Sequence, residues 1–102
     1  MKHLKTFENN LYQPKVGDYI LYYLEEYDHY YIFQIKKFFI EKIRVVIDTK
    51  YEVKNKKPIK VKTYHYEDTL KNLQKYTIYS SNNMEDCLER LNTIIETEKY
   101  NL

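Results

Sequence analysis

The sequence of 102 residues contains one glycine, one cysteine, two prolines and neither tryptophan nor alanine. A single glycine excludes the glycine-rich loops that hold phosphates in nucleotide-binding proteins. A single cysteine, Cys87, excludes an intramolecular disulfide and suits a reducing compartment. No stretch approaches the roughly 20 apolar residues of a membrane-spanning helix, and the first residues lack the apolar core of a secretory signal. We therefore expect a single-domain protein of the cytoplasm.

Charge is unevenly distributed along a chain whose net charge is only +2. Residues 50–75 carry eight lysines against three acidic residues, whereas residues 76–102 carry two basic residues against five acidic ones. Lysine supplies 15 of the 17 basic residues, and isoleucine, asparagine and tyrosine are abundant, a composition typical of AT-rich genomes. The lysine content by itself is therefore weak evidence for a nucleic-acid partner.

Five segments have the β-branched and aromatic content of strands. They are residues 16–24, 30–40, 43–53, 59–66 and 76–80. Gly17 lies where the first segment begins, and glycine permits a bend that other residues resist. The acidic loop 25–29 separates the first two segments. A break near Glu41-Lys42 must separate the next two, because strands rarely exceed about 10 residues.

Alternation in the third and fourth segments predicts a half-buried antiparallel sheet. One face of the third segment holds Ile43, Val45, Ile47, Tyr51 and Val53. One face of the fourth holds Ile59, Val61, Thr63 and His65. Asn55 and Pro58 mark the turn between them. Matching the two apolar faces predicts that Val53 opposes Ile59 and that Tyr51 opposes Val61.

The clearest helix is predicted over residues 82–98. Asn82 or Asn83 supplies the N-cap, and Glu85 and Asp86 complement the positive end of the helix dipole. Apolar side chains then recur at steps of three and four, which places them in one stripe. The stripe consists of Met84, Cys87, Leu88, Leu91, Ile94 and Ile95.

These elements predict an α+β domain that is mainly β. A five-stranded antiparallel barrel or curled sheet spans residues 16–80, and the C-terminal helix packs on it. Residues 68–75 are expected to form a helical turn or loop. Residues 1–13 form either a tail or a short helix carrying Leu4, Phe7 and Leu11, which Pro14 ends.

Catalytic groups are scattered rather than grouped in this sequence. Cys87 lies on the helix stripe, where a buried and inert thiol is expected. His3, His29 and His65 lack a second ligand at metal spacing, and His65 shares the apolar face of its strand. The loop acids Glu25, Glu26 and Asp28 are expected to be solvated. We predict a protein that is not an enzyme and that has no metal or cofactor.

Two sets of residues are candidates for binding. The first is a basic hairpin, for nucleic acid or an acidic partner: Lys50, Lys54, Lys56, Lys57, Lys60, Lys62, Tyr64 and Tyr66. Lysines contact phosphates and exposed tyrosines stack on bases, although a lysine-rich edge also keeps sheets from aggregating. The second is an aromatic groove that would hold a cation or a peptide, or else would belong to the core: Tyr22, Tyr27, Tyr30 and Tyr31.

Two resemblances add to this interpretation. The segment Val16-Gly17-Asp18-Tyr19-Ile20-Leu21, the following acidic loop and Tyr30-Tyr31-Ile32-Phe33-Gln34-Ile35 resemble the start of SH3-like barrels of the Tudor and chromo-barrel type. The chain also resembles small uncharacterised proteins of bacteriophages and related viral metagenomes. This resemblance is carried by the same first strand, by the opening Lys2-His3-Leu4-Lys5-Thr6-Phe7-Glu8-Asn9, and by the closing Ser80-Ser81-Asn82-Asn83-Met84-Glu85-Asp86-Cys87-Leu88 and Lys99-Tyr100-Asn101-Leu102. The second resemblance implies an accessory protein that acts in a bacterial host.

The function predicted from these features is protein binding. A phage-encoded inhibitor or modulator of a host protein, such as a defence nuclease in an anti-CRISPR-like manner, is the leading interpretation. Direct nucleic-acid binding through the lysine and tyrosine hairpin is the alternative, and a structural role in the virion is a third. No membrane partner is expected, and the oligomeric state stays open.

Overall fold

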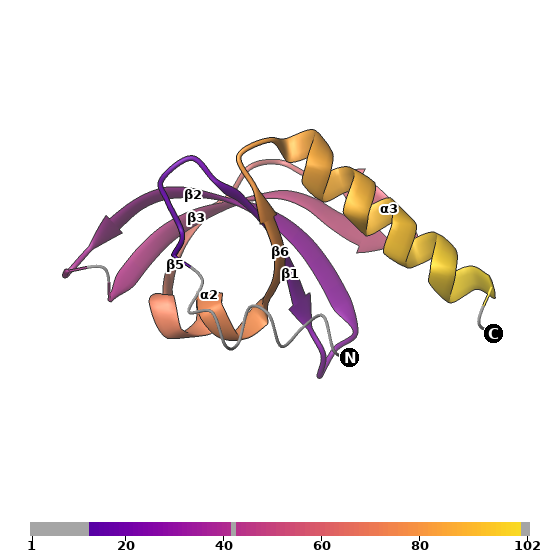
Figure 1. Ribbon diagram of the computed structural model, residues 1–102, viewed down its shortest axis with the longest axis horizontal. Helices are drawn as coiled ribbons and strands as arrows, with labels where there is room; N and C mark the ends of the chain where they lie inside the picture. The colour runs from indigo at the N-terminus through magenta and orange to yellow at the C-terminus, as the bar shows by residue number, and fades with distance from the viewer. Residues whose placement is uncertain (1–12, 42, 101–102) are drawn as a thin grey trace.

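The computed structural model describes residues 13–41 and 43–100, and the expected N-terminal helix within residues 1–13 lies almost wholly outside them (Figure 1). The elements in chain order are β1 (Tyr19–Leu24), β2 (His29–Phe39), β3 (Arg44–Lys54), β4 (Lys57–Lys60), β5 (His65–Thr69), α2 (Leu70–Tyr76), β6 (Thr77–Ser81) and α3 (Met84–Tyr100). The expected α+β fold, mainly β with a C-terminal helix, is confirmed.

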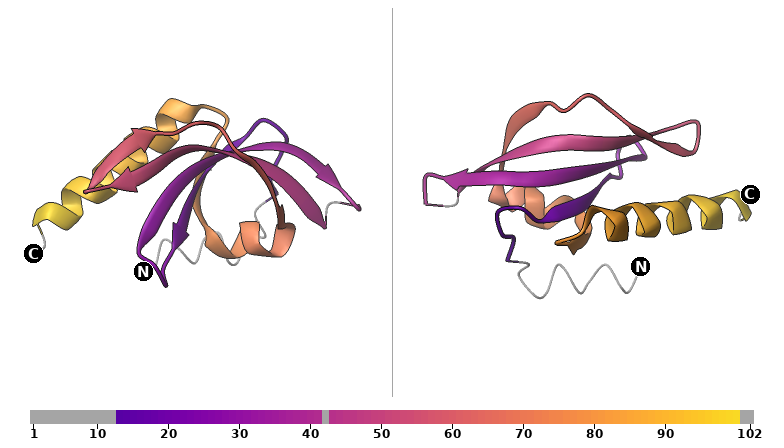
Figure 2. Two further views of the ribbon diagram at one scale, coloured as in Figure 1. Left: turned by 180° about the vertical axis from the view of Figure 1, so that it is seen from behind. Right: turned by 90° about the horizontal axis from the view of Figure 1, so that it is seen from above.

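The strands form one antiparallel sheet in the order β4-β3-β2-β1-β6, and β5 pairs with the first half of β3. The long strands β2 and β3 curve strongly, so the sheet is an open half-barrel (Figures 1 and 2). The short helix α2 lies on its concave side, and α3 lies against its outer side (Figure 1). One predicted strand, 59–66, is in fact two short strands, β4 and β5, which pair with different halves of β3.

The prediction that the apolar residues of segment 43–53 share one face is wrong, because the β2–β3 pairing contains bulges. Ile32 pairs with Tyr51 but Phe33 pairs with Thr49, so Lys50 is an extra residue in β3. An extra residue turns every following side chain to the opposite face. As a result, Val45 and Ile47 face the concave side, whereas Tyr51 and Val53 pack on the outer side. Ile43 precedes β3 and is exposed.

The predicted β3–β4 register is also wrong, by one residue. Val53 pairs with Pro58 and Glu52 with Ile59, so Val53 and Ile59 lie on opposite faces, and Ile59 is 41% exposed. The turn explains the shift. Asn55 and Lys56 both have positive φ, 53° and 61°, as in the two-residue type I′ turns that match strand twist. Such a turn requires Lys54 to pair with Lys57, whatever the apolar pattern favours.

Gly17 lies in the bend before β1, as predicted, and its φ of +94° explains the choice of glycine. The Asp18 amide donates to the Lys15 carbonyl at 3.0 Å, which closes the turn. The Gly17 amide donates to the Ile35 carbonyl of β2 at 2.8 Å, which ties the turn to the sheet.

The sheet has a separate core on each of its two faces. On the concave side the buried residues are Ile20, Tyr22, Phe33, Ile35, Val45, Ile47 and Leu73. On the outer side they are Leu21, Tyr30, Ile32, Cys87, Leu91 and Ile95. Because β1 and β2 are covered on both faces, both of their alternating sets of side chains are apolar or aromatic. The first core supports the cleft described below, and the second anchors α3.

Helix α3 has the N-cap and the apolar stripe that the sequence predicts. The Asn83 side chain accepts a hydrogen bond from the Glu85 amide at 2.8 Å, which identifies Asn83 as the N-cap. The predicted stripe is confirmed, since Cys87, Leu91 and Ile95 are buried against the sheet. No helix in the described part of the chain is both long and apolar enough to cross a membrane.

Candidate functional site

The concave side of the half-barrel holds an open cavity of about 470 Å³, which we call the tyrosine cleft. Its aromatic lining consists of Tyr22, Tyr31, Phe33, Tyr64, Tyr66 and Tyr76. The rest of the lining consists of Leu24, Thr49, Glu52, Asp68 and Asn72. Small-molecule and peptide-side-chain sites typically have volumes of roughly 300–1,000 Å³ and are mainly apolar with a few polar groups. The cleft has both properties.

The sheet register brings the aromatic rings together. Tyr22 of β1 lies directly opposite Tyr31 of β2, and Phe33 follows on the same face two residues later. The Tyr31 and Phe33 rings stack at 5.6 Å, and Tyr22 and Tyr66 each meet Phe33 edge to face, at 4.8 and 5.5 Å. Tyr76 of α2 then meets Tyr22 at 5.6 Å. Five of the six rings therefore form one connected network, in the offset and edge geometries that aromatic pairs prefer.

Asp68 connects the cleft to α2. Its Oδ2 accepts the Tyr22 hydroxyl at 2.7 Å, and its Oδ1 accepts the Thr69 amide at 2.8 Å and the Asn72 side-chain amide at 2.7 Å. Thr69 in turn caps α2 by accepting the Asn72 amide at 3.1 Å. Burial, followed by the hydrogen bond to Asp68, raises the pKa of Tyr22 well above its usual range. The Tyr22 phenol is therefore a neutral, fixed part of the floor.

The cleft has negative electrostatic character. Among the residues that the structure describes, its lining includes the carboxylates of Glu52 and Asp68 and no lysine, arginine or histidine. Burial raises the pKa of Tyr31, and the charge of Glu52 raises it further. Burial also raises the pKa of Tyr66, whose hydroxyl makes a short contact with that of Thr49. With neutral phenols and two carboxylates, the cleft favours a ligand that is neutral or positively charged.

The predicted aromatic groove is divided between the two faces of the sheet. Tyr22 and Tyr31 line the cleft. Tyr30 faces the outer side, where it stacks on Tyr23 at 4.5 Å and donates its hydroxyl to Glu98 of α3 at 2.9 Å. Tyr27 lies in the β1–β2 loop and is 67% exposed. Adjacent tyrosines in a strand point to opposite faces, which is why these four do not converge.

Four cleft aromatics were missing from the predicted groove: Phe33, Tyr64, Tyr66 and Tyr76. The period of two from Tyr31 provides a signal for Phe33, since the two share a face. Tyr64, Tyr66 and Tyr76 reach the cleft only because β5 and α2 close over the concave side, and no local pattern reveals that closure.

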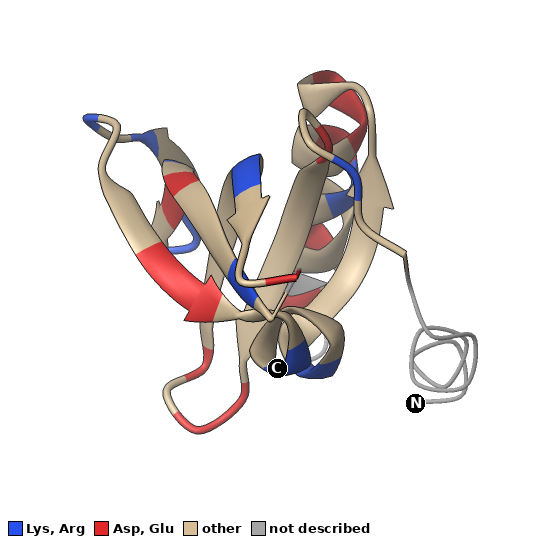
Figure 3. Ribbon diagram, turned by 90° about the vertical axis from the view of Figure 1, so that its left-hand side faces the viewer, with Lys and Arg blue, Asp and Glu red and all other residues tan. Residues whose placement is uncertain are grey.

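The predicted basic hairpin is also dispersed. Lys54, Lys56 and Lys57 are exposed at the β3–β4 turn. Figure 3 shows the lysine and arginine colour spread over several separate segments rather than gathered in one place. Lys60 and Lys62 are exposed, and the register places Lys60 on the outer face with Tyr51. Lys50 Nζ lies 3.7 Å from Asp48, and Tyr64 and Tyr66 line the negative cleft. The structure therefore separates the tyrosines from most of the lysines, and nucleic-acid binding stays a prediction.

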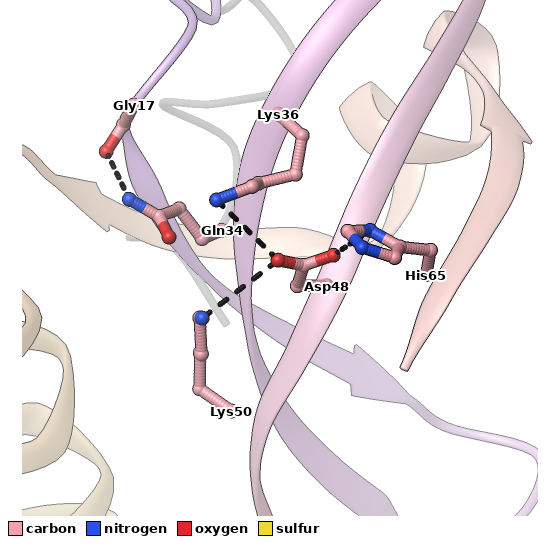
Figure 4. A network of polar contacts seen from close by, with 6 residues as sticks. All are labelled: Gly17, Gln34, Lys36, Asp48, Lys50 and His65. Carbon is pink, nitrogen blue, oxygen red and sulfur yellow. Dashed lines mark hydrogen bonds and ion pairs between the residues drawn. The ribbon is translucent and has the colours of Figure 1, made fainter. Parts of the chain in front are cut away.

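A second polar cluster surrounds Asp48 at the centre of the sheet (Figure 4). This carboxylate is 2% exposed, and its Oδ2 lies 3.5 Å from Lys36 Nζ and 3.7 Å from Lys50 Nζ. Its Oδ1 contacts Nδ1 of His65, whose side chain is 68% exposed. His65 was predicted on an apolar face, and that prediction is wrong, because β5 pairs with β3 and holds His65 beside Asp48. The cluster therefore places two ammonium groups and one imidazole around a buried carboxylate.

The single cysteine and the acids of the β1–β2 loop do not line the cleft. Cys87 is buried beneath α3, its thiol donates to the Tyr19 carbonyl at 3.5 Å, and burial raises its pKa to about 12. A buried thiol that keeps its proton is a poor nucleophile, because the thiolate is the reactive form. Glu25, Glu26 and Asp28 are exposed in the β1–β2 loop. Within residues 13–41 and 43–100, no three His, Cys, Asp or Glu side chains are grouped so as to hold a metal ion.

The fold and the site together define an α+β domain in which a curled antiparallel sheet carries an aromatic, negatively charged cleft. No protein-family model, curated protein or solved structure matches the chain.

Proposed function

We propose that the protein is a non-enzymatic binding module and that the tyrosine cleft is its protein-binding site. The observation that carries this proposal is the open cavity of about 470 Å³ lined by six aromatic side chains. Tyrosine is enriched in the energetic centres of protein interfaces, because its ring buries apolar area while its hydroxyl still forms hydrogen bonds. Tyr64 and Tyr66 are 56% and 40% exposed, so they are available to a partner.

The polar groups of the cleft support binding rather than catalysis. The Tyr22 hydroxyl is engaged by Asp68, and the Tyr66 hydroxyl by Thr49. A nucleophile needs an adjacent base that is itself oriented by a third group. Within the described lining, the Thr49 hydroxyl contacts the Tyr66 phenol rather than a carboxylate or imidazole, so the arrangement favours recognition of a partner.

The identity of the partner is a further part of this proposal. The resemblance to small bacteriophage proteins makes a host protein of the bacterial cytoplasm the expected partner, and inhibition or modulation of that protein the expected effect. Binding through the cleft would occupy a segment of the host protein, which is a direct route to inhibition when that segment is needed for activity.

Site-specific photo-crosslinking tests the proposal. A photoreactive phenylalanine analogue is placed at Tyr64, inside the cleft, and separately at Tyr27, which is exposed but outside it. In host lysate we expect the probe at position 64 to crosslink a specific protein. The probe at position 27 should not crosslink that protein. With that partner purified, Tyr64→Ala should weaken binding about tenfold or more by calorimetry, as for interface residues worth more than about 1 kcal/mol, and Tyr27→Ala should not. Equal crosslinking from both positions would contradict the proposal.

A further inference from the structure

The two carboxylates of the tyrosine cleft, Asp68 and Glu52, differ in the hydrogen bonds that they form with the rest of the fold. Both oxygens of Asp68 accept hydrogen bonds, from the Tyr22 hydroxyl, the Thr69 amide and the Asn72 side chain. The Glu52 side chain, by contrast, forms no hydrogen bond or ion pair with another described residue, and its charge acts only electrostatically on the Tyr31 and Tyr66 phenols. It lies at the rim, where a neighbouring groove that includes His29 and Lys54 adjoins the cleft. Glu52 is therefore the negative group that remains for a ligand.

The aromatic rings of the cleft present surfaces that attract cations. Tyr31 and Phe33 lie within 12° of parallel, and Tyr66 stands at 88° to Phe33. The face of an aromatic ring carries negative electrostatic potential. This attraction already occurs within the fold, since the Arg90 guanidinium lies 4.5 Å from the Tyr79 ring centroid and Lys75 Nζ lies 5.1 Å from that of Tyr76.

We propose that the ligand group held in the cleft is an arginine side chain of the partner, which stacks on the exposed tyrosine rings while its guanidinium pairs with Glu52. This inference rests on the proposed function and specifies the chemistry of the same site. The described lining carries two carboxylates and no basic side chain, so the cleft is complementary to a cationic side chain.

Arginine fits this arrangement better than other cations do. A guanidinium is planar and weakly hydrated, so it stacks on a ring and forms two parallel hydrogen bonds with one carboxylate. A lysine ammonium is strongly hydrated, and an open cleft replaces little of its water. A quaternary ammonium forms no hydrogen bonds, so it leaves the Glu52 oxygens unused.

Titration of the full-length protein with blocked tripeptides tests the inference. Each peptide has glycines on both sides of arginine, citrulline, lysine or trimethyl-lysine, and binding is followed by amide chemical shifts. We expect the arginine peptide to shift resonances of the cleft and to bind about tenfold more tightly than citrulline, its neutral counterpart. Glu52→Gln should reduce that preference to near unity. Glu26→Gln, which removes an exposed carboxylate outside the cleft, should leave it unchanged.

The outcomes separate this inference from the proposed function. Equal binding of arginine and citrulline, or tighter binding of trimethyl-lysine, would overturn the arginine assignment. If a partner crosslinked at position 64 were lost with Tyr64→Ala but kept with Glu52→Gln, the cleft would still be the binding site and only the arginine assignment would fail. If Tyr64→Ala left partner binding intact, the proposed function itself would fail.

Discussion

At the scale of single residues, Asp48 combines nearly complete burial with a charge. Its carboxylate is 2% exposed, whereas its basic partners Lys36, Lys50 and His65 are partly exposed. A buried charge is tolerated only when it is paired or hydrogen-bonded, because water no longer solvates it. The cluster also joins β5 to β3, since His65 lies directly opposite Asp48 in the ladder. Asp48 therefore contributes to the position of β5, which carries part of the cleft.

Asp48→Asn is expected to lower the free energy of unfolding by about 1–3 kcal/mol, because it removes the charge that three basic groups surround. Urea denaturation followed by circular dichroism measures the change. Glu67→Gln is the matched control, since Glu67 pairs with Arg44 at 3.3 Å but is 55% exposed. Exposed ion pairs contribute roughly 0–1 kcal/mol, so the control should change little. Equal effects of the two substitutions would show that burial of Asp48 is unimportant.

At the scale of elements, the β3–β4 turn determines the register of its hairpin. Asn55 and Lys56 both adopt positive φ, although lysine resists this conformation. The register follows from this two-residue turn, and it leaves Ile59 partly exposed. Turn geometry has therefore overridden the apolar pattern in this hairpin.

Lys56→Gly is expected to stabilise the protein, because asparagine followed by glycine is the preferred pair of a type I′ turn. Relief of the left-handed conformation is worth about 1–2 kcal/mol, and the extra freedom of glycine in the unfolded chain offsets about half of it. Thermal unfolding should show a gain of about 0.5–1 kcal/mol. The control Lys57→Gly falls within β4, where glycine should destabilise instead. A loss in both variants would contradict the turn assignment.

Helix α3 depends on its buried stripe for attachment to the sheet. Leu91 is fully buried in the outer core, so Leu91→Ala should lower stability by about 2–5 kcal/mol. Asn92→Ala, at the adjacent exposed position, should change it by less than about 0.5 kcal/mol. Chemical denaturation of the two variants provides the comparison. A negligible loss for Leu91→Ala would mean that the outer core does not hold α3.

At the scale of the whole molecule, the tyrosines with raised pKa values and the Cys87 thiol make the free energy of unfolding fall at alkaline pH. Burial raises the pKa of Tyr22, Tyr30, Tyr31 and Tyr66, and it raises the pKa of Tyr23 and of Cys87 to about 12. In the unfolded chain these groups lose their protons at lower pH than in the folded state. Their contribution to stability is complete below about pH 9 and is lost as pH rises through 12.

We therefore expect the protein to unfold in the alkaline range while some phenols are still protonated. Absorbance at 295 nm should show a group of tyrosines that form tyrosinate only when the circular dichroism signal is lost. Tyrosinate formation by all 13 tyrosines near pH 10, with the fold intact, would contradict this prediction.

The sequence was sufficient for the class of fold and for α3, because strand content, the asparagine N-cap and the apolar stripe are local signals. It was insufficient wherever tertiary pairing decides the outcome. The extra residue Lys50 in β3, the split of residues 59–66 into β4 and β5, and the side of the sheet that each tyrosine faces all depend on pairing between strands. Tyr22 and Tyr31 were predicted for the cleft, but Tyr66 and Tyr76 needed the closure by β5 and α2.

Reversing the charge of two lysines at different places on the molecule distinguishes binding through the cleft from the alternative, nucleic-acid binding. If the hairpin binds nucleic acid, Lys60→Glu combined with Lys62→Glu should abolish binding and flatten its dependence on salt, because each phosphate contact contributes to the slope. Lys71→Glu combined with Lys75→Glu makes the same change of charge on α2. The cleft proposal instead expects any oligonucleotide affinity at low salt to fall equally in both variants, and partner binding to survive in both. Filter binding over a salt series decides between them, and selective loss at positions 60 and 62 would favour nucleic acid.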